Sequence, residues 1–189
     1  MFSSIFEIEE SVGFMRESVL KLIKEGDICA EVGVWKGDFA QCILNQKPSQ
    51  LHLIDPWIHQ DYIDRYYSID QEKINTIYND VVVRFRQQTN VVIHKAFSTA
   101  VDFEEDFFDF VYIDGNHNYE NVKKDLEHYY PLVKKGGYIC GDDYWLWHTI
   151  PKDGFGSDSG GGPKKAVDEF AKKHNLKIKT IFNQFIIHV

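Results

Sequence analysis

The stretch Phe110-Val-Tyr-Ile-Asp-Gly-Asn-His-Asn-Tyr119 decides the fold class of this chain. Apolar and aromatic residues run directly into Asp114, and a glycine and then His117 follow. Such a run is typical of a buried strand that ends at the edge of a sheet, where loops carry the chemistry. We therefore expect a strand over 108–115 that delivers Asp114 and His117 to a functional edge.

The segments on either side of this stretch alternate between strand-like and helical patterns. We expect strands at 27–34, 49–57, 90–97, 108–115 and 138–142, helices at 38–44, 119–133 and 163–174, and a closing hairpin of 177–182 and 184–189. The pairs Lys134-Lys135 and Gly136-Gly137 are expected to stop the helix at 119–133. Strands that alternate with helices predict an α/β fold with a doubly wound, mostly parallel sheet, to which the hairpin adds an antiparallel strand.

Length and charge limit the classes of function. The 189 residues suit one domain, 1–189, and a net charge of −8 argues against nucleic acid or an anionic membrane surface as partner. The acidic start lacks a signal peptide pattern, and no apolar run is long enough to span a bilayer, so we expect a cytoplasmic protein. Cys29, Cys42 and Cys140 have no metal-site spacing and are expected to be core residues.

Three segments are expected to lie outside the sheet. Residues 5–25 have helical periodicity and predict an N-terminal helical cap within 1–26. Segments 58–89 and 145–163 leave two strand ends, so both are expected to cover one cleft as substrate lids. Their aromatic residues could form its walls; they are Trp57, Tyr62, Tyr66, Tyr67, Trp145 and Trp147, with His148 beside them.

The turn after the first strand indicates the ligand. Glu31-Val-Gly-Val-Trp-Lys-Gly37 is a strand, a glycine-bearing turn and a helix start, the arrangement that points backbone N–H groups at a ligand. Its pattern is E-x-G-x-x-x-G rather than the G-x-G-x-x-G of dinucleotide sites. An acid here is unfavourable beside a pyrophosphate but suits the positive charge of S-adenosylmethionine. Asp55, at the end of the second strand, could bind ribose hydroxyls in either class of enzyme.

Three longer stretches, AEVGVWKGDFA, LHLIDPW and FDFVYIDGNHNYENVKKDLEHYYPLVKKGGYICGDDY, carry a family resemblance. Together they resemble class I S-adenosylmethionine-dependent methyltransferases. Within that class they are similar to small-molecule O-methyltransferases of the macrocin and mycinamicin type, a pattern shared by cephalosporin-hydroxylase-like sequences. The resemblance covers roughly residues 27–143 and the AVDEF helix near 166–170.

The resemblance implies a seven-stranded Rossmann-like sheet with an antiparallel last strand. It assigns Glu31, Gly33 and Gly37 to the cofactor loop and Asp55 to the ribose. It also places Phe97 and Ser98 beside the adenine. The chain departs from the pattern at Val34-Trp35, where many relatives carry a second glycine, and at 95–98, where relatives often have G-D-S.

Asp114, Asp142 and Asp143 follow two neighbouring strands, and oxygen ligands of this kind suit Mg²⁺ or another hard divalent cation. In the resembling enzymes such a metal holds the substrate hydroxyls and lowers the pKa of the one to be methylated. Asp114 is thus expected among the catalytic, cofactor-binding and metal-binding residues. His117 is the expected general base, because an imidazole titrates near neutrality.

We therefore expect metal-assisted transfer of a methyl group to a hydroxyl of a small molecule, such as a sugar or glycosylated metabolite, by a possible homo-oligomer. Two other functions stay open: an NAD(P)-dependent oxidoreductase, and a non-catalytic binding protein on a methyltransferase scaffold. The residues also have structural interpretations. Asp114 could cap a turn, Asp142-Asp143 could form a solvated turn, and His117 could line the cofactor or a turn.

Overall fold

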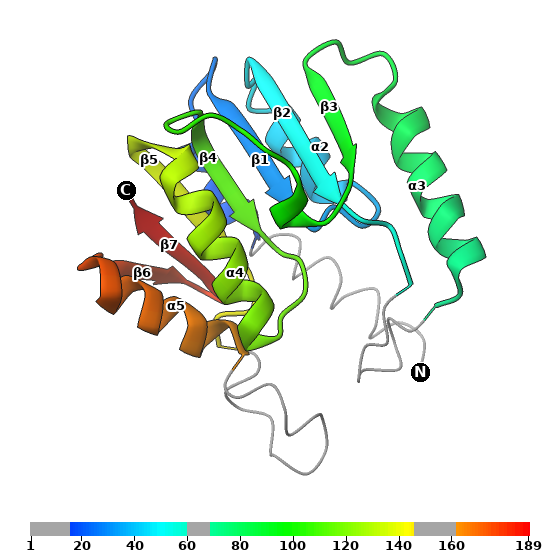
Figure 1. The fold of residues 1–189 in the computed structure, drawn as a ribbon. Coiled ribbons are helices and arrows are strands. Elements are labelled where there is room, and N and C mark those ends of the chain that lie inside the picture. Colours follow the sequence, from blue (N-terminus) through cyan, green and yellow to red (C-terminus); the bar gives the residue numbers. More distant parts are fainter. Residues whose placement is uncertain (1–15, 60–68, 146–161) are drawn as a thin grey trace.

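The computed structural model describes residues 16–59, 69–145 and 162–189. Its centre is a seven-stranded sheet with the order β3-β2-β1-β4-β5-β7-β6 (Figure 1). The strands are β1 (Ile28–Val32), β2 (Gln50–Asp55), β3 (Val91–Lys95), β4 (Phe108–Ile113), β5 (Val133–Gly141), β6 (Ile178–Ile181) and β7 (Gln184–His188). The helical elements are η1 (Glu17–Leu22), α2 (Asp38–Leu44), α3 (Gln71–Phe85), η2 (Ser98–Ala100), α4 (Tyr119–Tyr129), η3 (Tyr130–Leu132) and α5 (Gly162–His174).

The topology confirms the predicted class I methyltransferase architecture. Strands β1 to β5 pair in parallel, whereas β7 runs antiparallel to both of its neighbours, β5 and β6. The order of strands reverses at β1, which lies between β2 and β4. In open α/β sheets, ligands bind outside the carboxyl ends of the strands at such a reversal.

Both faces of the sheet are covered, so its central strands are buried on both sides. Residues Phe110 and Tyr112 of β4 pack with η1, α2 and α3 on one face. The alternating residues Val111 and Ile113 pack with α4 and α5 on the other. Figure 1 shows α4 and α5 side by side on the near face of the sheet. This double burial explains why residues 110–113 of β4 read as an unbroken apolar run in the sequence.

Two element boundaries differ from the prediction by more than two residues. The helix expected at 119–133 ends at Tyr129, because Pro131 has no N–H to donate and the chain tightens into η3. The residues expected to stop that helix, Lys134 to Gly137, lie within β5, which begins at Val133 rather than at 138. The register of β5 against β4 shifts between Phe108 and Phe110, so this first part of the strand is irregular.

The segments expected outside the sheet are described only in part. Of the N-terminal cap, the described part is the short 3₁₀ helix η1. The expected lid at 58–89 contains α3, whose buried Ile74, Val81 and Phe85 pack on the sheet as an ordinary covering helix. Trp57 is 2% exposed and belongs to the core rather than to a cleft wall. The remaining aromatic candidates, Trp145 excepted, lie outside the described residues, as does His148.

The cysteines agree with their predicted role. Cys29 and Cys140 are buried, Cys42 is partly buried, and all three are free thiols. Within the described ranges, no helix has both the length and the hydropathy needed to cross a bilayer.

Candidate functional site

Gly33 begins the loop after β1 in a backbone conformation that requires glycine. Its φ is +89°, and a Cβ at this position would lie 2.2 Å from the carbonyl oxygen of Asp114. The backbone of the first loop is therefore in direct contact with the backbone at the end of β4. Gly37 has φ +77° at the N-cap of α2, where a Cβ would meet the ring of Phe85 at 2.9 Å. Each of the two predicted loop glycines is therefore required for a different steric reason: Gly33 by the Asp114 carbonyl and Gly37 by the Phe85 ring.

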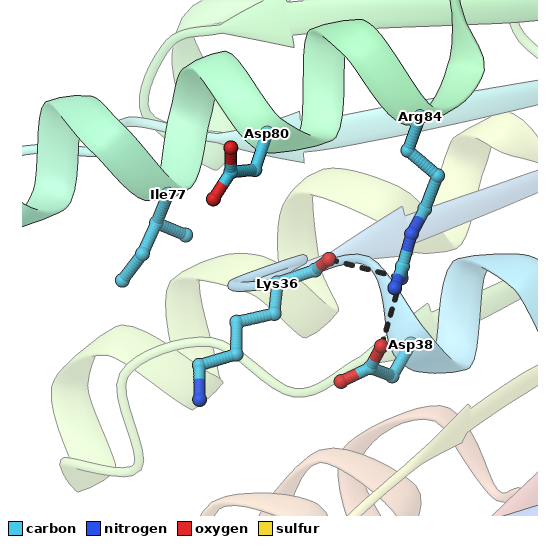
Figure 2. Close-up of a pocket in the computed structure, with 5 residues that line it drawn as sticks. All are labelled: Lys36, Asp38, Ile77, Asp80 and Arg84. Carbon is cyan, nitrogen blue, oxygen red and sulfur yellow. Dashed lines mark hydrogen bonds and ion pairs between the residues drawn. The ribbon is translucent and has the colours of Figure 1, made fainter.

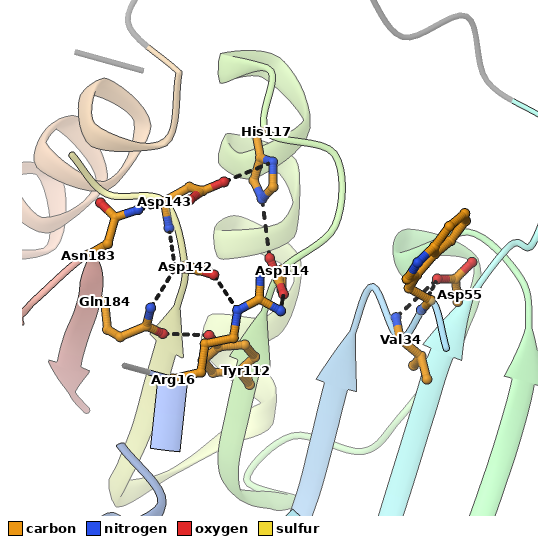
Figure 3. Close-up of polar contacts among 11 residues, drawn as sticks. Arg16, Val34, Asp55, Tyr112, Asp114, His117, Asp142, Asp143, Asn183 and Gln184 are labelled. Carbon is orange, nitrogen blue, oxygen red and sulfur yellow. Dashed lines mark hydrogen bonds and ion pairs between the residues drawn. The ribbon is translucent and has the colours of Figure 1, made fainter. Parts of the chain in front are cut away.

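Asp55 organises the first loop. Its Oδ2 accepts a hydrogen bond at 3.0 Å from the backbone N–H of Val34 (Figure 3). The same oxygen accepts one at 3.0 Å from the backbone N–H of Trp35, and Oδ1 accepts one at 2.7 Å from that of Trp57. Trp35 and Trp57 have φ of +53° and +43°, which is rare for bulky residues. The indole N–H of Trp57 also donates to the carbonyl of Trp35 at 3.0 Å. These unusual conformations lie where the predicted cofactor loop meets the predicted ribose carboxylate, and strained backbone is typical of ligand sites.

The outer side of the same loop is held by α3. Arg84 donates from Nη1 to the carbonyl of Lys36 at 3.1 Å and to Asp38 Oδ1 at 2.8 Å. These residues line a surface pocket with Ile77 and Asp80 of α3 (Figure 2). Arg84 therefore links α3 to the beginning of α2 and holds the first loop on its outer side.

Glu31, in β1, is the most unusual acid of the chain. It is 1% exposed, and its Oε2 has no hydrogen-bond partner among the described residues. Burial, with the negative charges of Asp114 and Asp55, raises its pKa well above the usual range, although Arg16 acts in the opposite direction. A buried carboxylate oxygen without a donor is costly, so this atom fits a ligand that brings a donor or a positive charge.

The two residues predicted beside adenine differ in their surroundings. The side chain of Phe97 is 57% exposed at the end of β3. Ser98 donates its hydroxyl to Asp125, and its carbonyl accepts from the Tyr129 hydroxyl at 3.1 Å. Burial raises the pKa of Asp125 to about 6. Phe97 is thus available to a planar ligand, while the Ser98 side chain is already engaged by α4.

The three aspartates predicted at the ends of β4 and β5 do come together, and Arg16, the residue before η1, contacts two of them. Arg16 lies 2.7 Å from Asp114 Oδ2 through Nη1 and 2.5 Å from Asp142 Oδ2 through Nε (Figure 3). The carboxylates are largely buried: the Asp142 side chain is 3% exposed, that of Asp114 7% and that of Asp143 15%. Burial raises the pKa of Asp143 to about 6, although the charge of His117 lowers it.

His117 bridges two of these carboxylates. Its Nε2 lies 3.3 Å from Asp114 Oδ1 and its Nδ1 lies 3.4 Å from Asp143 Oδ2 (Figure 3). Burial lowers the pKa of His117, but the hydrogen bond to Asp114 and the charges of the three aspartates outweigh it and raise the pKa above its usual value. A histidine so placed can hold or transfer a proton near neutral pH.

Residues of the closing hairpin donate hydrogen bonds to two of the aspartates. Gln184 donates to Asp142 Oδ1 at 2.5 Å and accepts from the buried hydroxyl of Tyr112 at 2.5 Å. Asn183 donates to Asp143 Oδ1 at 2.8 Å. Asp143 has φ +58°, a left-handed conformation that aspartate tolerates. The carboxylates are therefore oriented by fixed donors.

The sequence prediction missed Arg16, Asn183 and Gln184. All three reach the aspartates from segments that are remote in the chain. One signal was present for Gln184: a polar residue in the apolar strand 184–189 is out of pattern unless it binds a buried partner. Arg16 offered no comparable signal, because a single arginine in an amphipathic segment ordinarily faces solvent.

The predicted metal receives no support from this arrangement. Within the described ranges, no group of three or more His, Cys, Asp or Glu side chains has the geometry of a metal site. Asp114 and Asp142 instead share the guanidinium of Arg16. The residues present therefore do not fit an additional divalent cation between these two carboxylates.

Comparison with known proteins identifies the family. A family model described as a methyltransferase domain matches residues 30–144, which include the first loop and the acidic cluster. An uncharacterized protein of Acanthamoeba polyphaga mimivirus is 53% identical over 44 residues, which are 23% of this chain. The match spans only 20% of that relative's length.

Two solved structures share the fold at low sequence identity. A protein of Corynebacterium glutamicum superposes with a TM-score of 0.63 and 16% identity, over 92% of this chain and 78% of that one. An S-adenosylmethionine-dependent methyltransferase of Aquifex aeolicus gives a TM-score of 0.56 and 14% identity, over 91% and 86% of the two chains. These likenesses support the fold.

The family match covers more than half of the 189 residues and spans the strands that carry the site. It favours the methyltransferase prediction over a nicotinamide-dependent oxidoreductase, as does the lack of a G-x-G-x-x-G turn. The chain therefore belongs to the S-adenosylmethionine-dependent methyltransferase family.

Proposed function

We propose that this protein transfers a methyl group from S-adenosylmethionine to a hydroxyl of a small molecule, a sugar or a glycosylated metabolite. The observation that carries the proposal is the buried carboxylate of Glu31, whose Oε2 has no donor among the described residues. It lies in β1, two residues before Gly33 and the loop that Asp55 holds. A carboxyl group in that position suits a ligand whose amino-acid tail carries an ammonium group.

The residues present fit S-adenosylmethionine, which supplies an activated methyl group when bound. Glu31 would accept from its amino group, and the loop from Gly33 to Gly37 would lie along its amino-acid portion. Asp55 would bind the ribose: each carboxylate oxygen has two lone pairs, and Oδ1 accepts only the Trp57 N–H among the described residues. Phe97 offers an exposed ring to the adenine.

His117 would remove the hydroxyl proton, with Asp114 as its orienting partner. In the neutral imidazole, Nε2–H would donate to Asp114 and Nδ1 would accept the proton, because only one ring nitrogen of a neutral histidine carries hydrogen. Asp143, 3.4 Å from Nδ1, would stabilise the imidazolium that forms. Proton removal by a positioned base contributes about 10²–10⁴-fold in typical enzymes.

An exposed aromatic side chain two positions after Asp143 favours a sugar. The Trp145 side chain is 43% exposed, and its backbone N–H donates at 2.7 Å to Asn183, the residue that also binds Asp143. Aromatic faces next to hydrogen-bonding groups suit the apolar face and hydroxyls of a sugar ring. The acidic net charge of −8 further favours a neutral or cationic acceptor.

The test is transfer of a labelled methyl group from S-adenosylmethionine to a panel of sugars, glycosides and catechols. We expect turnover with at least one hydroxylated acceptor and a loss of about 10²-fold or more in kcat for His117→Ala. His188→Ala, at an exposed position on the last strand, is the matched control and should keep full activity. Equal turnover by the two variants would reject His117 as the base. Labelling of an amine but of no hydroxyl would reject O-methylation.

A further inference from the structure

Arg16 lies in the place where the sequence predicts a metal. Its guanidinium binds one carboxylate at the end of β4 and another at the end of β5, through Nη1 and Nε respectively (Figure 3). The Arg16 side chain is only 29% exposed. A planar guanidinium presents its donors in a fixed fork, so it can hold two carboxylates in a defined relative position.

Protein donors already face the carboxylate oxygens that a metal would use. Each of the two oxygens of Asp114, Asp142 and Asp143 faces at least one protein donor. The donors are Nη1 and Nε of Arg16, the two ring nitrogens of His117 in its protonated form, the side-chain amides of Asn183 and Gln184, and the backbone N–H of Asp143. A divalent cation binds carboxylate oxygens at about 2.0–2.6 Å and would have to displace these donors.

Charge balance makes the cation necessary. Asp114 and Asp142 have side chains only 7% and 3% exposed, and two carboxylates this buried repel each other unless a positive charge lies between them. Removing one partner from a buried ionic cluster is strongly destabilising, because the remaining charge is left uncompensated. Within the described ranges, Arg16 is the cation that forms ion pairs with both carboxylates.

We propose that Arg16 is the resident counter-ion of the Asp114–Asp142 pair and takes the place of a divalent metal, so that this protein works without added metal. The proposal rests on the proposed function only for its methyl-transfer readout, because metal binding can be measured separately. Arg16 acts through the two aspartates and is thus a positioning residue. Loss of its side chain should uncover a carboxylate pair that attracts divalent cations.

The experiment measures Mn²⁺ binding to the chelator-treated full chain by electron paramagnetic resonance. We expect no saturable Mn²⁺ site in the unaltered protein. Arg16→Ala should gain one saturable Mn²⁺ site, with an affinity at least about tenfold above the residual Mn²⁺ binding of the unaltered protein. Arg16→Lys keeps a positive charge and should bind Mn²⁺ no better than the unaltered protein. Arg86→Ala removes an exposed arginine at the end of α3 and is the matched control. Methyl transfer by the unaltered protein should persist in excess chelator.

Two results would overturn the inference. One is a saturable Mn²⁺ site in the unaltered protein that disappears in Asp142→Asn. The other is an Arg16→Ala variant that is folded by circular dichroism but binds Mn²⁺ no better than Arg86→Ala. If Arg16→Ala does not fold, Arg16→Gln replaces it, and the test on the unaltered protein still decides. S-adenosylhomocysteine binding to the same samples separates the two proposals. If S-adenosylhomocysteine does not bind, the proposed function is rejected, and the Mn²⁺ measurements still test the role of Arg16.

Discussion

Arg16 donates from Nε to Asp142 Oδ2 at 2.5 Å, across 126 positions of the sequence. This contact joins the short helix η1 to the end of β5, and a second contact from the same guanidinium reaches Asp114 at the end of β4. The acidic cluster at this edge of the sheet is therefore completed by a segment outside the family match at 30–144. Variation in that segment among relatives would change the charge of the site without altering the sheet.

Two glycines with similar backbone conformations should respond very differently to alanine. Gly33 and Gly26 have φ of +89° and +94°, but only at Gly33 would a Cβ meet other atoms, 2.2 Å from the Asp114 carbonyl oxygen. We expect Gly33→Ala to lower the free energy of unfolding by about 3 kcal/mol or more, and Gly26→Ala by about 1 kcal/mol. Urea unfolding measures both. Equal losses would mean that the first loop does not pack on the end of β4 as described.

The protonation of His117 should depend on its two carboxylate neighbours. The structure raises its pKa above the usual value of about 6.5. In an NMR titration its ring signals should therefore move above pH 6.5, and Asp114→Asn or Asp143→Asn should lower the midpoint. If His117 is the base, kcat rises as pH rises through that midpoint, since the base must be neutral. An unchanged midpoint in both variants would argue against the ion pairs.

A second histidine pair should make the fold sensitive to acid. Burial, together with the neighbouring His94, lowers the pKa of His52 to about 4, and its Nδ1 lies 2.9 Å from His94 Nε2. The unfolded chain, with a histidine pKa of about 6.5, binds more protons than the folded protein between these values. Stability is therefore fully present above about pH 6.5 and falls as the pH drops towards about 4.

Thermal unfolding measured from pH 7.5 to 4.5 checks this sign. His52→Phe removes the titrating group, so its stability should fall less steeply over that range than that of the unaltered protein. His188→Phe, at an exposed position, serves as the control and should keep the original slope. A His52→Phe profile parallel to the original one would show that other groups cause the acid sensitivity.

The contact of Arg84 with the first loop should contribute modestly to cofactor binding. Arg84 binds the Lys36 carbonyl and Asp38, but its side chain is 40% exposed and that of Asp38 is 74% exposed. Exposed pairs of this kind contribute about 0.2–1 kcal/mol. We expect Arg84→Ala to weaken S-adenosylhomocysteine binding by up to about fivefold in isothermal titration, and Arg86→Ala to leave it unchanged. A loss of about a hundredfold would mean that Arg84 contacts the ligand itself.

Much of the fold was predictable because it depends on local patterns. The apolar run before Asp114 and the glycines after Glu31 mark β4 and the first loop through periodicity and turn chemistry. The helix ending at Tyr129 was not predicted. A lysine pair followed by two glycines is typical of a helix end, yet Pro131 had already ended the helix upstream.

The acidic cluster was predictable only in part. Parallel strands bring their carboxyl ends to one edge, which is why Asp114, Asp142 and Asp143 could be placed together from sequence. The cation that neutralises them comes from a segment remote in the chain. No local sequence pattern predicts that the Arg16 side chain contacts these aspartates. Three clustered carboxylates therefore predicted a metal, whereas the described residues supply an arginine and a histidine.

Binding of S-adenosylhomocysteine to the full chain, measured by isothermal titration, tests the central claim most directly. The account predicts saturable 1:1 binding that weakens by about tenfold or more in Glu31→Gln, whose amide cannot ionise to pair with the ligand's ammonium group, and stays unchanged in Glu25→Gln, whose side chain is 74% exposed. Tight binding of NAD without any binding of S-adenosylhomocysteine would contradict it.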